Sequence, residues 1–194
     1  MKNIKIALAL ILALVMVLAF ASCKTEEYVE SEKPVSGETQ KPKDDGASAA
    51  AGTFGYEVPQ DFTELEKKDG QITYVSDKYP EETSNIVYTE SPGAYFKGAM
   101  TAEKLEKTFE LAFKNQYDLE TDIVIDAFEE VEIESFPGYI VVMHYELQGQ
   151  KVFQTQLMLG MGEKLHNLVF TQMNDEDYSE KFGNCLDSVT ITAG

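Results

Sequence analysis

The chain has 194 residues, of which 43% are apolar and 26% charged, a composition that excludes wholesale disorder. It contains 16 lysines, no arginine and 34 acidic residues, which give a net charge of −18. Nucleic-acid binding requires a basic surface that neutralises phosphates, so this charge excludes that class of function. It also disfavours direct docking on anionic lipid. Two cysteines are too few for a disulfide framework.

Residues 1–22 are predicted to be a lipoprotein signal peptide. Lys2 and Lys5 precede an unbroken apolar run, Ile6 to Phe20, which is shorter than the ~20 residues of a membrane-spanning helix. Phe20-Ala21-Ser22-Cys23 then resembles the lipobox of bacterial lipoproteins, with Phe20 where leucine is commoner. The resemblance implies cleavage before Cys23 and a diacylglycerol on its thiol. The alternative is ordinary cleavage after Ala21, which would release a secreted protein with a free cysteine.

Residues 23–52 are predicted to be a flexible linker that begins with the lipidated cysteine. Glu, Lys, Ser, Thr, Pro, Gly and Ala dominate the segment, so it has too little apolar surface to offset the entropy of ordering. As a coil it would span roughly 30 Å. We expect it to hold a folded domain clear of the membrane or to thread it into cell-wall polymer.

Residues 53–194 are predicted to form one α+β domain. The domain has 10 lysines and 27 acidic residues, a net charge of −17, and it is long enough to bury an independent core. Eight segments rich in β-branched and aromatic residues are bounded by turn-forming residues and are predicted to be strands. They are Phe54–Val58, Thr63–Lys67, Gln71–Ser76, Asn85–Thr89, Ile123–Glu134, Tyr139–Leu147, Val152–Met161 and Leu165–Met173.

Three turns connect the later strands. Gly149-Gln150 and Gly162-Glu163 have glycine first, as a two-residue type II′ hairpin turn requires. The last three long strands should therefore form an antiparallel meander. A wider turn or a bulge is expected at Pro137-Gly138, because a tight turn there would place glutamates opposite apolar residues.

Two helices are predicted from their apolar periodicity. Thr101 can cap the first, which carries an apolar stripe; Asn174 or Asp175 can cap the second, which carries another. We expect both stripes to pack on the sheet and to bury Phe109, Phe113, Phe182 and Leu186. The stripe residues are Leu105, Phe109, Ala112 and Phe113 in the first helix, and Tyr178, Phe182, Cys185 and Leu186 in the second.

The domain resembles the PsbP-like group, which includes DcrB-like and Mog-like domains. The resemblance is carried by Tyr56-Glu57-Val58-Pro59 followed by Phe62, by the long hairpins, and by the closing helix that runs into Leu186-Asp187-Ser188-Val189. It implies an antiparallel sheet with a helix on each face. It also implies an accessory or binding role and specifies no reaction.

The sequence carries no recognisable catalytic motif. It lacks Gly-x-Ser-x-Gly, a phosphate-binding loop and a dinucleotide fingerprint, and Cys185 lies on an apolar stripe where a buried thiol is expected. Counting from the predicted turns places His144 opposite Thr155 and His166 opposite Leu159. These positions are ~13 Å apart along the strand, so the two histidines should not share a zinc ion.

Carboxylates are the abundant reactive groups. Glu130, Glu132 and Glu134 alternate on one strand face, which indicates a solvated face or a docking surface for a basic partner or cations. Asp118, Glu120, Asp122 and Asp126 follow the first helix, where the helix dipole disfavours anions. An exposed acidic loop is the main interpretation. Asp118, Glu120 and Asp122 are the candidates if the loop binds Ca²⁺.

Two functions from different classes fit these observations. The first is a membrane-tethered, extracytoplasmic accessory or binding lipoprotein with no catalytic residue, metal or cofactor. It would be a monomer on the cell membrane, with an envelope protein or cell-wall polymer as partner. The second is an extracytoplasmic hydrolase of cell-envelope polymer that uses two carboxylates, with Glu57 and Glu146 as candidates.

Overall fold

A computed structural model describes residues 52–68, 70–93, 100–147 and 149–193. The predicted signal peptide, the lipobox with Cys23 and nearly all of the predicted linker lie outside these described residues. Among the helices described, none has both the length and the apolar character needed to cross a membrane.

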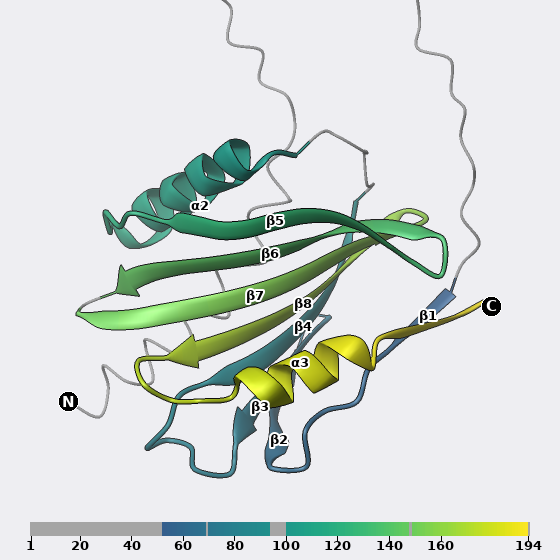
Figure 1. The fold of residues 1–194 in the computed structure, drawn as a ribbon, viewed down its shortest axis with the longest axis horizontal. Helices are drawn as coiled ribbons and strands as arrows, with labels where there is room; N and C mark the ends of the chain where they lie inside the picture. Colours follow the sequence, from purple (N-terminus) through teal and green to yellow (C-terminus); the bar gives the residue numbers. More distant parts are fainter. Residues whose placement is uncertain (1–51, 69, 94–99, 148, 194) are drawn as a thin grey trace, which may run out of the picture.

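The described chain builds one seven-stranded antiparallel sheet and one small two-stranded sheet (Figure 1). In β7 and β8 six consecutive residues are buried, and successive side chains point to opposite faces, so both faces of the large sheet carry buried residues. The predicted meander of the last long strands is confirmed as β6-β7-β8. The order of the large sheet is β2 (Phe62–Lys68), β3 (Gln71–Ser76), β4 (Asn85–Pro92), β8 (Lys164–Met173), β7 (Gln150–Met161), β6 (Phe136–Leu147) and β5 (Val124–Ile133), and β1 (Gly52–Gly55) pairs with β9 (Thr190–Ala193).

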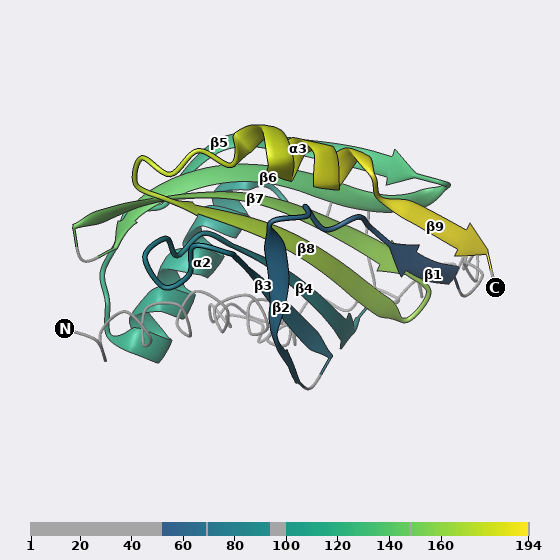
Figure 2. The same ribbon diagram turned by 90° about the horizontal axis from the view of Figure 1, so that it is seen from below.

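The helices α2 (Ala102–Tyr117) and α3 (Ser179–Asp187) lie on opposite faces of the large sheet, as Figure 2 shows from the side. The α2 face and the α3 face each hold a separate apolar cluster. The predicted α+β architecture, a sheet with a helix on each face, is confirmed.

The helix α2 follows the local rules of helix formation. The Thr101 side chain accepts a hydrogen bond from the backbone N–H of Lys104 (3.3 Å), which confirms the predicted cap. At the other end Asp118 adopts a left-handed conformation (φ 52°) and its N–H donates to the Lys114 carbonyl. The predicted burial of Phe109 and Phe113 is confirmed.

The segment before α3 differs from its prediction. The N-cap is Tyr178 and makes no side-chain cap bond, so the predicted caps Asn174 and Asp175 are wrong. Asn174 instead occupies a left-handed turn (φ 51°), and its side-chain oxygen accepts the N–H of Lys151 (3.1 Å). The residues after Asn174 connect the end of β8 to the start of α3.

Two hairpin predictions also require correction. Leu147 pairs with Gln150, so the β6–β7 turn comes one residue earlier than the predicted Gly149-Gln150. The β5–β6 turn is Glu134-Ser135, both with positive φ, and Pro137 and Gly138 lie inside β6. A Cβ on Gly138 would lie 2.2 Å from the Met158 carbonyl oxygen, so this glycine serves close strand approach rather than a turn. The Gly162-Glu163 turn is confirmed, with Met161 paired to Lys164 and a φ of 65° at Gly162.

The edges of the fold also hold elements that differ from expectation. The strand β1 ends at Gly55, although we predicted Phe54–Val58, and β9 was not predicted. These two strands pair with each other at the C-terminal end of α3 (Figure 1). Four-residue strands carry too little pattern to be read from sequence alone.

Candidate functional site

The helix α3 is attached to the sheet through its buried stripe. Phe182 packs against Phe170 of β8 and Phe62 of β2, with ring centroids 5.3 and 5.7 Å apart. Phe182 and Cys185 are buried as predicted, whereas Leu186 is only half-buried. The prediction that Leu186 is buried is therefore wrong, because it lies at the open side of the helix.

Side-chain hydrogen bonds fix the start of α3 in place of a conventional cap. The Gln172 side-chain oxygen accepts the N–H of Tyr178 (2.9 Å). The Glu176 carboxylate accepts the N–H groups of Thr83 (3.2 Å) and Ser84 (3.0 Å), and also the Ser84 hydroxyl. The loop before α3 is thus bound to the loop before β4, which sets the position of the helix over the sheet.

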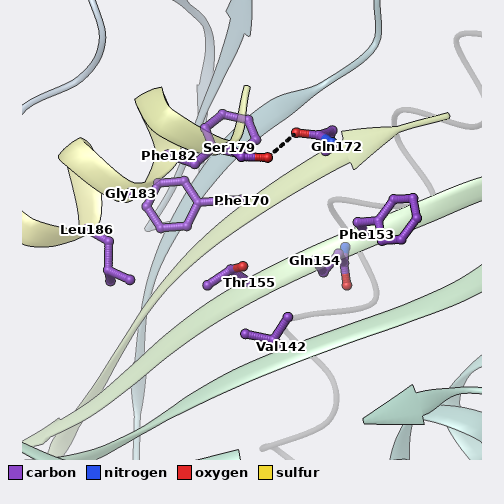
Figure 3. A pocket seen from close by; sticks show the side chains of 10 residues that line it. All are labelled: Val142, Phe153, Gln154, Thr155, Phe170, Gln172, Ser179, Phe182, Gly183 and Leu186. Atoms are coloured by element: carbon purple, nitrogen blue, oxygen red, sulfur yellow. Dashed lines mark hydrogen bonds between the residues drawn. The ribbon is translucent and has the colours of Figure 1, made fainter. Parts of the chain in front are cut away.

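A groove of about 390 Å³ lies beside α3, on the α3 face of the sheet (Figure 3). That volume is at the low end of the ~300–1,000 Å³ typical of ligand sites. Its lining is mainly apolar, and the Gln172 and Ser179 side chains lie at one end (Figure 3). The lining residues are Val142, Phe153, Gln154, Thr155, Phe170, Gln172, Ser179, Phe182, Gly183 and Leu186.

Gly183 keeps the helical wall of this groove open. A Cβ built on Gly183 meets no atom within 4 Å outside the helix's own backbone, so the space beside it is empty of protein. Glycine in a helix interior costs roughly 0.8–1.0 kcal/mol relative to alanine. A nine-residue helix therefore carries an unfavourable residue at the position where a side chain would narrow the groove.

The groove opens at Phe153, whose side chain is 40% exposed although it lies in a central strand. Next to it lies His144, with ring centroids 6.0 Å apart. The Nδ1 atom of His144 is 2.7 Å from an Asp126 carboxylate oxygen, and both side chains are more than two-fifths exposed. This end of the groove is aromatic and exposed to solvent, and the Asp126 carboxylate lies beside it.

A second cluster on the same face is aromatic and partly buried. A hydrogen bond joins the Tyr88 phenol oxygen and His166 Nδ1 (2.8 Å), and Phe54 stacks on both rings at 5.4 Å. Burial raises the pKa of Tyr88 to about 12 and lowers the pKa of His166. Burial also raises the pKa of Tyr56, whose ring contacts Tyr88. All of these groups are neutral near pH 7, so the cluster contributes to the apolar packing of the α3 face and carries no charge.

The environments of Cys185, His144 and His166 exclude a reactive thiol and a shared metal ion. Burial raises the pKa of the Cys185 thiol to about 11, so it is protonated and inert, as its place on the apolar stripe indicates. His166 pairs with Leu159 as predicted, but His144 pairs with Phe153 rather than Thr155, because the β6–β7 turn is one residue earlier. The two histidines are therefore about 20 Å apart along β7 and cannot share a metal ion.

The acidic candidates do not converge. Lys114 lies between Asp118 and Glu120, with N–O distances of 3.1 and 2.9 Å, which explains how this helix end accommodates anions. Asp122 is exposed beside them. Within the described residues no group of three metal-ligating side chains is close enough to hold an ion. On β5, Glu134 belongs to the turn and not to the strand face.

The two glutamates considered for hydrolysis lie outside the groove. Glu57 and Glu146 are both exposed, and neither is among the lining residues. The Glu57 N–H donates to the Ser188 hydroxyl, and the Glu146 carbonyl accepts the Thr121 hydroxyl, so each is tied to a different element. No carboxylate lines the groove itself.

Sequence reasoning missed the two residues that define the groove, Gly183 and Phe153. Both carried a usable signal. Gly183 is a helix-breaking residue in the middle of an amphipathic helix, and Phe153 points to the α3 face at a position beyond the reach of that helix.

Comparison with known proteins supports the fold. No protein-family model matches the sequence, and no curated protein matches it significantly. The solution structure of the PsbP protein of the cyanobacterium Synechocystis, CyanoP, is similar over 80% of this chain and 98% of that chain, with 11% identity and a TM-score of 0.53. The domain has a PsbP-like fold.

Two further solved structures show weaker similarity. LpqN of Mycobacterium tuberculosis, a protein involved in cell envelope biogenesis, is 17% identical over 74% of this chain and 85% of its own, with a TM-score of 0.45. A Bacteroides thetaiotaomicron protein is 17% identical over 73% of this chain, with a TM-score of 0.44. The match covers 45% of that protein, so this chain spans less than half its length. At these identities the similarity concerns the fold alone.

Proposed function

We propose that this chain is a lipid-anchored, extracytoplasmic accessory protein that binds an envelope partner and performs no chemistry of its own. The observation that carries this proposal is the groove beside α3. Its lining is apolar and amide-bearing, and it contains no carboxylate, histidine or cysteine. Ser179 is the one serine among the lining residues, and its hydroxyl donates to the amide oxygen of Gln172 (3.4 Å), which cannot act as a general base.

The anchoring part of the proposal rests on the amino-terminal sequence. A basic start, an apolar run of 15 residues and Phe20-Ala21-Ser22-Cys23 support export followed by lipidation of Cys23. Two acyl chains on one cysteine would hold the protein stably at the membrane. The charge of −17 on the domain would keep it off the anionic lipid surface.

Metabolic labelling in a bacterial host tests this function. Cells grown with an alkyne-bearing palmitate should yield a labelled protein in the membrane fraction. Cys23→Ser should abolish the label, and Cys185→Ala should leave it unchanged, because Cys185 is buried in the folded domain. An unlabelled wild-type protein, or label that survives in the Cys23→Ser variant, would show that the lipoprotein interpretation is wrong.

A further inference from the structure

The groove continues into an uncovered apolar strip on the same face of the sheet. By strand register, Val124 and Ala127 of β5 lie on the α3 face beside Val142 of β6, and Phe153 follows on β7. Val124 is 44% exposed and Phe153 is 40% exposed. In Figure 1, α3 lies along the β8 side, and no described helix crosses β5, β6 and β7 on this face. We call the groove and this strip together the α3-side surface.

The border of the α3-side surface is acidic. The Asp126 carboxylate reaches this face at the β5 bulge, where it meets His144. Glu129 lies opposite Ile140, and Glu146 lies two positions beyond His144, so both belong to the same face and both are exposed. Lys151 lies opposite Glu146 and offsets one of these charges. The border therefore keeps a net negative charge.

Charge decides between the occupants that an apolar surface could take. A second copy of this chain would bring another domain of net charge −17 against the first, which opposes self-association. Anionic lipid and nucleic acid are repelled for the same reason. A positively charged partner with apolar side chains satisfies both the lining and the border.

We propose that the α3-side surface docks a basic segment of a partner protein, with the segment's apolar side chains in the groove and its lysines or arginines against Asp126, Glu129 and Glu146. This proposal rests on the proposed binding function and names the partner's chemistry. The groove volume suits one or two large side chains rather than an extended lipid. Gly183 leaves the space for them, at a cost to the helix that folding alone does not explain.

The test uses the full chain in nanodiscs of neutral phosphatidylcholine and a dye-labelled heptapeptide of alternating lysine and leucine. Fluorescence polarisation measures binding, with empty nanodiscs as the blank. Peptides of alternating lysine and serine, and of alternating glutamate and leucine, are the comparisons. The lysine–leucine peptide should bind about tenfold more tightly than either one, because only it offers both charge and apolar side chains.

A matched pair of variants separates the groove from the rest of the helix. Gly183→Leu places a leucine in the open space and should weaken binding about tenfold. Asn184→Leu adds the same side chain at the next, exposed position and should leave binding unchanged. Melting temperatures of both variants show that the fold is retained. Equal binding by Gly183→Leu and wild type would overturn the proposal.

A second pair separates local charge from net charge. The double variant Asp126→Asn, Glu129→Gln and the double variant Glu64→Gln, Glu66→Gln remove the same number of charges, the latter from β2 at the opposite edge of the sheet. The first pair should weaken binding at least threefold more than the second. Equal weakening by both pairs, or equal binding of the lysine–serine peptide, would mean general attraction to an acidic protein and would refute the docking surface. Each of these outcomes is a ratio between peptides or variants in the same preparation, so none of them measures lipidation, which the palmitate label tests separately.

Discussion

On one face of the sheet, the sixteen-residue α2 packs on a continuous apolar cluster; on the other, the nine-residue α3 leaves a groove beside it. The helix α2 has a threonine cap and a left-handed C-cap, and it has no glycine in its interior. The helix α3 has no side-chain cap bond and carries Gly183 near its centre. Departures from local helix rules therefore gather on the face that holds the groove, which is where a binding role is expected.

The α2 face is not uniformly apolar. Gln154 and Gln156 of β7 both lie on it and are both buried. Gln154 donates to the Thr171 hydroxyl (3.0 Å), whereas neither side-chain amide atom of Gln156 has a hydrogen-bond partner. The closed face thus contains a polar side chain that costs stability, and the open face contains a helix whose central residue is glycine.

The largest expected effect is the loss of an aromatic side chain from the closed face. Phe113 is 1% exposed and packs edge-to-face on Tyr145, with ring centroids 5.2 Å apart. Phe113→Ala should cost about 3–5 kcal/mol of unfolding free energy, since both transfer and cavity penalties apply. Phe182→Ala should cost less, about 2–3 kcal/mol, because water from the groove can enter the space. Chemical denaturation measures both, and a larger loss for Phe182→Ala would invert the comparison.

A smaller change of opposite sign in the unfolding free energy is expected at Gln156, whose side-chain amide has no hydrogen-bond partner. Gln156→Met keeps the length of the side chain and removes two unsatisfied polar atoms, so it should raise the unfolding free energy by about 1 kcal/mol. The control is Gln154→Met, which breaks the bond to Thr171 and should lower the unfolding free energy by about the same amount. If both substitutions destabilise alike, the Gln156 amide has a stabilising role in the native protein.

Much of this fold could be predicted because its signals are periodic. Long strands with alternating apolar residues, and α2 with its stripe and cap, follow from spacing and local hydrogen bonding. The β5–β6 turn could not be read correctly, because Pro137 and Gly138 usually mark turns and here serve close strand packing. The start of α3 was missed because the loop before it is held by Glu176, whose partners Thr83 and Ser84 lie about 92 residues away in sequence.

The groove was less accessible to prediction than the fold. It exists because α3 lies along the β8 side of the sheet (Figure 1), and the placement of a helix on a sheet is a tertiary property. Sequence spacing identified His144 and His166, yet a turn shifted by one residue changed the position of His144 on β7 by two residues. The residue that lies opposite a given strand residue can be inferred only if the turn between the two strands is placed correctly. The burial of a helix stripe does not depend on any turn.

Gly183 should report the cost of keeping the groove open. Gly183→Ala adds a methyl group that meets no other element and removes backbone freedom from the unfolded chain, so it should stabilise the protein by about 0.5–1 kcal/mol. Gly138→Ala is the control on the strand side, where the new Cβ would collide with the Met158 carbonyl and lower stability. A destabilising Gly183→Ala would show that the helix needs glycine for its own backbone.

An effect of pH is expected at the aromatic cluster of the α3 face. Burial lowers the pKa of His166, with Glu90 opposing and Lys164 reinforcing the shift, and Glu90 and Lys164 also pair with each other. Since the folded pKa lies below the unfolded value of ~6.5, the unfolded chain binds more protons as the pH falls through that value, and stability is lost. The slope for one group cannot exceed about 1.4 kcal/mol per pH unit. Unfolding free energies between pH 7.5 and 5.5 should therefore decline less steeply in His166→Gln than in wild type. A slope that is the same in His166→Gln and in wild type would show that His166 is not the group responsible for the loss of stability.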